Sequence, residues 1–83
     1  MELKDTIVGM TSLDYKERLK AEYRQVKIRY DALIKFLYPA NGVREKELSF
    51  DQLELMMKQS FYMYEYMIAL SKRAEIEGID LYA

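Results

Sequence analysis

Two rows of polar side chains recur at helical spacing and could bind a ligand. One row recurs at spacings of four, three and four over residues 18–29, and the other at three, four and seven over residues 59–73. Arginine presents a planar fork that matches phosphate oxygens, tyrosine rings can stack on nucleobases, and Glu or Gln can hydrogen bond to a base edge. The candidate ligand-binding residues are Tyr15, Arg18, Glu22, Gln25, Arg29, Gln59, Tyr66 and Arg73.

The same rows are also typical of a hydrogen-bond network between two helices. In that interpretation Arg18 pairs with Glu22 at i,i+4, and Tyr66 donates to Glu22. Buried polar networks of this kind can set helix register and oligomer choice. The two interpretations are compatible if a ligand site is completed only between subunits, so the residues alone leave both open.

The composition argues against catalytic and metal chemistry. The 83 residues include no Cys and no His, and the acidic residues show no nucleophile–base constellation. We therefore expect no enzyme, no catalytic residue, no metal and no cofactor. The 13 basic and 14 acidic residues nearly balance, which argues against a duplex-DNA partner.

The apolar segments of the chain are short. No run approaches the roughly 18 apolar residues of a membrane span, and the acidic N-terminal stretch does not resemble a signal peptide. We therefore expect a cytoplasmic protein with no membrane partner.

Glycine and proline positions predict two long helices in a single domain over residues 1–83. The only internal Pro-Gly cluster is Tyr38–Gly42, so we expect helices over about 12–37 and 49–77, joined by a loop over 38–48. Thr11 or Ser12 is expected to cap the first helix, and Ser49 with Gln52 forms a capping box for the second. Gly78 suits the end of the second helix, and residues 79–83 are expected to be extended or frayed.

Apolar residues at alternating spacings of three and four predict that these helices pack as an antiparallel hairpin. Facing positions should have residue numbers that sum to about 88, which sets Glu22 opposite Tyr66, Tyr15 opposite Arg73 and Arg29 opposite Gln59. The expected fold is all-α, an antiparallel two-helix hairpin with a short N-terminal segment. The predicted seams are Tyr15, Leu19, Glu22, Val26, Tyr30, Leu33 and Leu37 on the first helix, and Leu53, Met56, Ser60, Met63, Met67, Leu70 and Ala74 on the second.

A second apolar stripe on the later helix predicts self-association. A two-helix hairpin buries one stripe per helix, and an exposed patch of this size is typical of an interface. The alternative is that the N-terminal segment, through Leu3, Ile7, Val8 and Met10, covers the stripe. The stripe comprises Met57, Phe61, Tyr64 and Ile68, and we expect it to form a homo-oligomer interface.

Residues 15–77 resemble small phage proteins related to a crAss-like phage product. The resemblance on the first helix lies in Asp14–Arg18, Glu22, Arg29, Leu33 and Phe36. On the second helix it lies in Leu48, Ser49, Leu53, Gln59, Met63, Tyr66, Leu70 and Arg73–Glu77. The resemblance implies a phage or prophage origin.

By size and hairpin design the chain is also similar to the anti-CBASS and Thoeris anti-defence hairpin proteins, which assemble and sequester cyclic nucleotide signals. This similarity implies that the polar rows, completed by a neighbouring subunit, capture a cyclic nucleotide or an NAD-derived signal in the infected host cell. Two alternatives stay open. The stripe could dock on a host defence protein as an inhibitor, or the chain could be a purely structural phage assembly factor.

Overall fold

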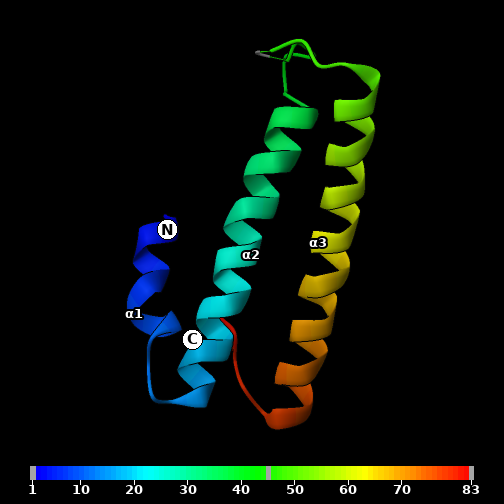
Figure 1. The fold of residues 1–83 in the computed structure, drawn as a ribbon. Helices are drawn as coiled ribbons and strands as arrows, with labels where there is room; N and C mark the ends of the chain where they lie inside the picture. Colours follow the sequence, from blue (N-terminus) through cyan, green and yellow to red (C-terminus); the bar gives the residue numbers. More distant parts are fainter. Residues whose placement is uncertain (1, 45, 83) are drawn as a thin grey trace.

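Two long helices and a short helical N-terminal segment make up the computed structural model, which describes residues 2–44 and 46–82. In chain order the elements are η1 (Leu3–Thr6), α1 (Ile7–Met10), α2 (Tyr15–Leu37) and α3 (Phe50–Glu77). Helices α2 and α3 run antiparallel, and α1 lies on the side of α2 away from α3 (Figure 1). Among the described residues the regular elements are all helices and none is a strand, as the sequence predicts.

Helix α2 begins later than its expected start near residue 12. Asp14 is the N-cap, and its carboxylate accepts the backbone N–H of Lys16 at 2.9 Å. The expected caps have other partners. The Ser12 hydroxyl accepts the N–H of Asp14, and the Thr11 hydroxyl donates to the Ile7 carbonyl. The expectation that Thr11 or Ser12 caps this helix is therefore wrong, because both residues close the turn between α1 and α2.

The termini of α3 follow the sequence prediction closely. The Ser49 side chain accepts the N–H of Gln52, and the Gln52 side chain accepts the N–H of Ser49, so the capping box is complete. Gly78 ends the helix with φ of 70°, in the left-handed region that glycine adopts without strain.

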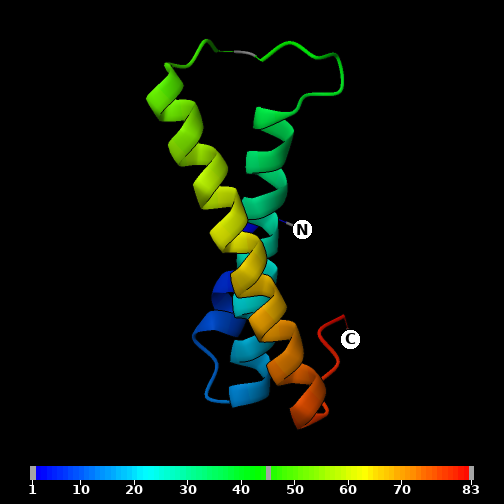
Figure 2. The same ribbon diagram turned by 90° about the vertical axis from the view of Figure 1, so that its right-hand side faces the viewer.

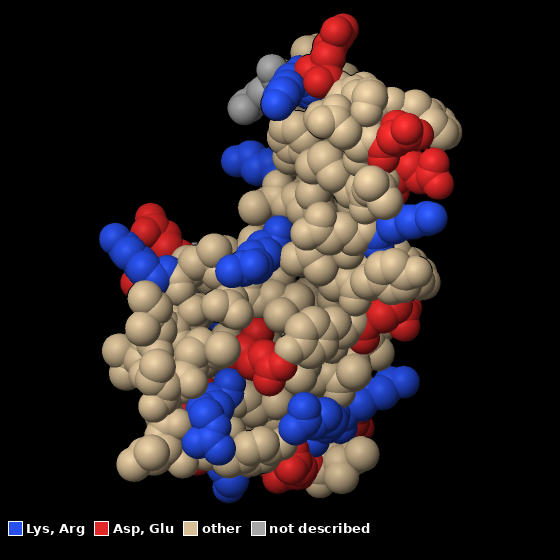
Figure 3. Space-filling model, in the orientation of Figure 1, with Lys and Arg blue, Asp and Glu red and all other residues tan. Residues whose placement is uncertain are grey.

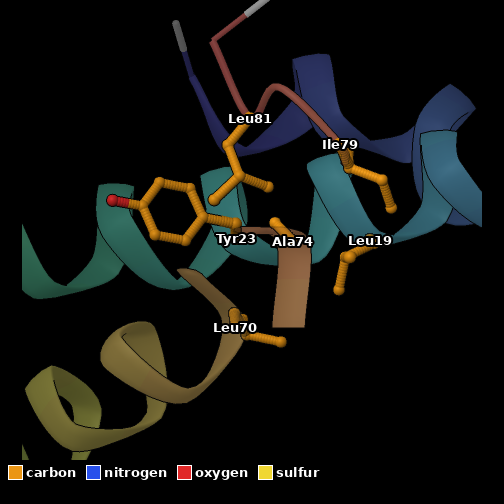
Figure 4. Packing of buried hydrophobic residues seen from close by; sticks show 6 residues of the cluster. All are labelled: Leu19, Tyr23, Leu70, Ala74, Ile79 and Leu81. Atoms are coloured by element: carbon orange, nitrogen blue, oxygen red, sulfur yellow. The ribbon is translucent and has the colours of Figure 1, made fainter. Parts of the chain in front are cut away.

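The hydrophobic core lies at the end of the hairpin away from the loop. Leu19 of α2 and Leu70 and Ala74 of α3 are almost fully buried and form one cluster with Tyr23 (Figure 4). Toward the loop the two helices diverge (Figure 2), and there Leu33 and Met56 are only partly buried. The main cluster therefore lies at the end away from the loop, and Leu37, at the loop end of α2, is buried apart from it.

The C-terminal tail completes this core, contrary to the expectation that residues 79–83 are extended or frayed. Gly78 reverses the chain, and the N–H of Ile79 donates to the Ala74 carbonyl at 2.8 Å. Ile79 and Leu81 are then only 8% and 6% exposed. The expectation fails for the described residues because a two-helix seam leaves this end of the core open, and the tail supplies the missing apolar side chains. Ala83 lies outside the described residues.

The N-terminal segment packs on α2 and not on α3. Thr6 and, on α2, Ala21 are buried in this contact, and Gly9 lies close to Ala21. Leu3, Ile7, Val8 and Met10 remain exposed. The alternative that this segment covers the apolar stripe of α3 is therefore wrong for the described residues.

Candidate functional site

The two predicted polar rows meet along one edge of the α2–α3 pair. Tyr66 donates a hydrogen bond to Glu22, and Arg73 donates to the Tyr15 hydroxyl at 2.5 Å. The residue numbers in each pair sum to 88, so the predicted register of the hairpin is confirmed. The edge is polar, and it joins the helices at two levels.

At the packed end of this edge the charged groups satisfy one another. The Tyr15 hydroxyl accepts from Arg73 and donates to a Glu77 carboxylate oxygen at 3.1 Å. Arg18 donates to the Ser12 carbonyl at 2.8 Å, and its guanidinium lies 6.0 Å from the centroid of the Tyr15 ring. These contacts have the form of a structural network.

Arg18 has no ion pair with Glu22 in the structure, contrary to the sequence expectation. Its guanidinium instead turns toward the start of α2 and the Ser12 carbonyl, while Glu22 accepts from Tyr66. An exposed i,i+4 ion pair contributes only a few tenths of a kcal/mol. A backbone carbonyl and an aromatic ring within reach are therefore sufficient to redirect the arginine.

Halfway along the hairpin the predicted site residues have no such partners. Gln25, Arg29 and Gln59 form no hydrogen bond or ion pair with the part of the chain that the structure describes. Arg29 and Gln59 are exposed, and Gln25 is half-buried. The predicted contact of Arg29 with Gln59 is absent there, which leaves both side chains available to a ligand.

A shallow apolar pocket of about 460 Å³ lies on α3, and Gln59 is one of the residues that line it. Gln59 and Tyr66 line it, together with residues that sequence reasoning did not assign to a site, chiefly Leu55 and Lys58. The signal was present in the sequence, because Leu55 extends the spacing of Gln59, Tyr62 and Tyr66 by four residues. The lining is mostly apolar and includes side chains with amide, phenol and ammonium groups, a combination typical of small-molecule sites.

The apolar stripe of α3 is largely open to solvent. Met57, Phe61 and Tyr64 are 44%, 59% and 49% exposed, while Ile68 is half-buried. A hollow of about 360 Å³ lies on the loop-proximal half of the stripe, between Met57, Phe61 and Phe50. The predicted unpartnered surface is therefore present in the single chain.

The other edge of the hairpin holds a tyrosine pair that sequence reasoning missed. The hydroxyls of Tyr23 and Tyr82 are 2.9 Å apart, and their rings meet edge to face. The hydrogen bond with Tyr82, followed by burial, raises the pKa of the Tyr23 phenol. No local spacing links these residues, because the folded-back tail alone brings them together.

Next to this pair, Lys27 forms an ion pair with Asp31 at 2.9 Å. The hydrogen bond to Asp31, together with the charge of its carboxylate, raises the pKa of Lys27. Both groups line a shallow hollow of about 400 Å³ that the tail closes on one side. The positive charge of Lys27 is therefore largely neutralised by the Asp31 carboxylate, one turn along α2.

The charged side chains of the described residues bear on two kinds of partner, a metal ion and a large anion. Within residues 2–44 and 46–82, no group of three acidic side chains is placed to hold a metal ion. On the face drawn in Figure 3, basic and acidic side chains are interspersed. None of the described helices combines the length and the apolar character needed to cross a membrane.

Comparison with known families decides the class of this hairpin. A family model described as Sequestin matches residues 13–76, which include all of α2 and all of α3 except its last residue, Glu77. The chain belongs to the Sequestin family. It matches no curated protein and no solved structure.

The name Sequestin suggests sequestration of a ligand, which is a binding role and not a catalytic one. The matched region begins after η1 and α1, and it ends before the tail residues Ile79 and Leu81. The Sequestin region therefore coincides with the α2–α3 pair that carries the polar edge and the apolar stripe.

Proposed function

We propose that this protein is a phage anti-defence protein that binds and sequesters a small anionic nucleotide immune signal. The ligand is a cyclic nucleotide or an NAD-derived signal. The protein binds it without catalysing any reaction, in the cytoplasm of the infected host cell. The sites lie between subunits of a homo-oligomer. The observation that carries the proposal is the group of unpartnered polar side chains, Gln25, Arg29 and Gln59, at mid-height on a Sequestin hairpin.

The polar edge divides into two parts with different roles. Tyr15, Glu22, Tyr66 and Arg73 already bond to one another, and they hold the two helices in register. Arg29 has no bonded partner among the described residues, and its guanidinium can meet a phosphate with two parallel hydrogen bonds. We therefore assign phosphate contact first to Arg29, and base contact to Gln25, Gln59 and the exposed ring of Tyr66.

A shared site explains why one chain shows only half a pocket. The hollow between Leu55, Gln59 and Tyr66 is shallow, whereas a nucleotide site that sequesters its ligand must enclose most of it. A second subunit provides the missing wall. The near balance of charge in the chain is compatible with this role, because a few placed donors suffice for one small anion.

Ligand screening against the purified protein tests the proposal. The probes are cyclic mono-, di- and trinucleotides and cyclic ADP-ribose isomers, with the linear mononucleotides as controls. A ligand at a hundred times its dissociation constant adds about 2.7 kcal/mol of stability. For a domain of this size that corresponds to a rise in Tm of about 10 °C or more.

The bound ligand must also be recovered chemically unchanged after heat denaturation of the complex, as mass spectrometry will show. A ligand returned as a cleaved product would contradict sequestration. If none of the probes raises Tm and calorimetry detects no heat of binding, the nucleotide proposal is wrong.

The exposed apolar stripe supports a second function, in which it docks on a host defence protein. That function predicts no stabilisation by nucleotides, and it predicts one specific partner recovered by pull-down that is lost in the Phe61→Glu variant. A purely structural phage assembly factor would instead self-associate and bind neither nucleotide nor host protein.

A further inference from the structure

Four charged residues of alternating sign follow the apolar stripe along one flank of α3. Asp51, Lys58, Glu65 and Lys72 recur every seven residues, so they lie in one line along the helix. All four are exposed. Lys58 makes a loose intrahelical ion pair with Glu54 at 3.7 Å, and the other three have no ion pair with the described residues. We call these four residues the charged column.

We propose that the stripe of α3 packs against the same stripe of a second copy, with the two α3 helices antiparallel. The proposal builds on the self-association in the proposed function and specifies its partner and geometry. It does not depend on the identity of the ligand, because the contact forms from α3 alone.

The stripe has the spacing that an antiparallel helix pair needs. Met57, Phe61, Tyr64 and Ile68 alternate spacings of four and three, which is the pattern of a two-helix seam. With the two-fold axis crossing between Phe61 and Tyr64, Phe61 packs against Tyr64 of the second copy. Met57 then packs against Ile68 of the second copy, and symmetry repeats both layers.

The hollow on the stripe fits this arrangement. It lies between Met57 and Phe61, its exposed lining is mostly apolar surface, and the charged side chains Glu54 and Lys58 also line it. In the proposed register, Ile68 and Tyr64 of the second copy lie opposite these two residues. Their side chains would fill the hollow as knobs in a hole, and the exposed area of Phe61 would be buried.

The charged column selects this direction and register. A two-fold axis across the helices brings the same flank of both copies together. Lys58 then lies opposite Glu65 of the second copy, and Asp51 opposite Lys72 of the second copy. Along the column the signs run negative, positive, negative, positive. When a second copy runs in the opposite direction, each negative residue therefore faces a positive one, and every facing pair is attractive.

Neighbouring registers are disfavoured by the same residues. A slip of one heptad still pairs part of the stripe with itself, Phe61 with Met57 or Tyr64 with Ile68. It sets Lys58 opposite Lys58 or Lys72, and Glu65 opposite Asp51 or Glu65. Like charges then meet in every facing pair, which is destabilising. The column therefore distinguishes registers that the apolar stripe alone would allow.

Charge swaps test the proposal in ligand-free protein, so that failure to find a nucleotide does not affect the result. Lys58→Glu and Glu65→Lys, each alone, should weaken the dimer about tenfold, because symmetry makes two facing pairs repulsive at once. Mixing the two variants should restore association, since the introduced glutamate of one variant then faces the introduced lysine of the other. Analytical ultracentrifugation with one variant mass-tagged measures the heterodimer.

The controls separate the interface from general charge effects. Lys46→Glu in the loop changes the net charge as much as Lys58→Glu and should leave the dimer unchanged. Phe61→Glu should yield monomers that retain their helical circular dichroism.

Three results would overturn the proposal. The first is a wild-type chain that is monomeric at about 100 µM, and the second is a Phe61→Glu variant of unchanged mass. The third is a mixture of Lys58→Glu and Glu65→Lys with no preference for the heterodimer.

Discussion

Tyr66 of α3 donates a hydrogen bond to Glu22 of α2, and the two residues are 44 positions apart in the chain. The bond lies beside the seam, where Ser60 and Val26 are buried. It therefore ties the register of the hairpin to the same edge that carries the candidate ligand residues. Register and binding are linked through this pair, so its removal is informative about both.

Tyr66→Phe is expected to lower the free energy of unfolding by about 0.5–1.5 kcal/mol. The phenylalanine keeps the ring and loses only the donor, and a single intramolecular hydrogen bond has this net value. Urea denaturation measures the change. A double-mutant cycle with Glu22→Gln should give a coupling energy of similar size, and additive single effects would contradict a direct bond.

Arg29→Ala is expected to weaken nucleotide binding by about 1.5–3 kcal/mol, the usual value of a hydrogen bond to a charged group. Helical content and unfolding free energy should change little, because Arg29 has no partner in the described part of the chain. Calorimetry measures the first effect and thermal denaturation the second. A variant that loses fold and assembly together would favour a structural role.

Arg18→Ala provides a comparison on the same row. The Arg18 guanidinium donates to the Ser12 carbonyl, so its removal should loosen the turn before α2 as well as weaken any ligand contact. We expect Arg18→Ala to lower Tm more than Arg29→Ala. Equal losses of Tm would mean that the Ser12 contact contributes nothing in solution.

Leu81→Ala is expected to destabilise the protein by about 2–4 kcal/mol. The side chain is buried in the cluster that holds Tyr23 and Leu19, and its truncation leaves a cavity in the core. Ile76→Ala is the matched control, because Ile76 is 87% exposed and should change stability by less than about 0.5 kcal/mol. Similar unfolding curves for the two variants would show that the tail does not dock.

Gly9→Ala is expected to release the N-terminal segment from α2. A Cβ at this position would lie 2.7 Å from the Cβ of Ala21, and neither backbone can yield without separating the segments. Amide hydrogen exchange over residues 2–10 should then rise, while α3 stays protected. The exposed Val8→Ala variant is the control, and unchanged exchange in Gly9→Ala would contradict the packing.

Alkaline pH is expected to destabilise the fold through the pair of Tyr23 and Tyr82. Because the folded-state pKa of Tyr23 is raised, the unfolded chain loses this phenolic proton first. The contribution of Tyr23 to the free energy of unfolding is therefore complete below a pH of about 10, the pKa of an unperturbed tyrosine. It is lost as the pH rises through the pKa of Tyr23 in the folded protein. The raised pKa of Lys27 acts in the same direction.

Denaturation of the wild type and Tyr82→Phe between pH 8 and 11 isolates the tyrosine effect. The variant lacks the largest cause of the shift, the hydrogen bond with Tyr82, so its stability should fall less steeply. Parallel pH profiles would contradict the hydrogen bond.

Local chemistry in the sequence determined where α3 begins and ends and how the two long helices face each other. Ser49 with Gln52 and the glycine at residue 78 mark the limits of α3, because capping and left-handed backbone depend on a few adjacent residues. The periodic apolar residues set the seam, and Glu22 meets Tyr66 as their numbers predicted. The exposed stripe of Met57, Phe61 and Tyr64 was equally readable, since it follows from helical geometry alone.

Only the tertiary structure decided which partners the remaining segments found. Ile79 and Leu81 carry no periodic signal, and they are buried because the end of a two-helix core is open to any nearby apolar chain. Arg18 donates to a backbone carbonyl and not to Glu22, since competing contacts of similar energy are settled by distances in space. Distances in space also decided which residues of the polar edge are bonded to one another. Among the described residues, the side chains left without a partner there are Gln25, Arg29 and Gln59. Helical spacing places side chains on a face, but contact across that face depends on how far apart the helices lie.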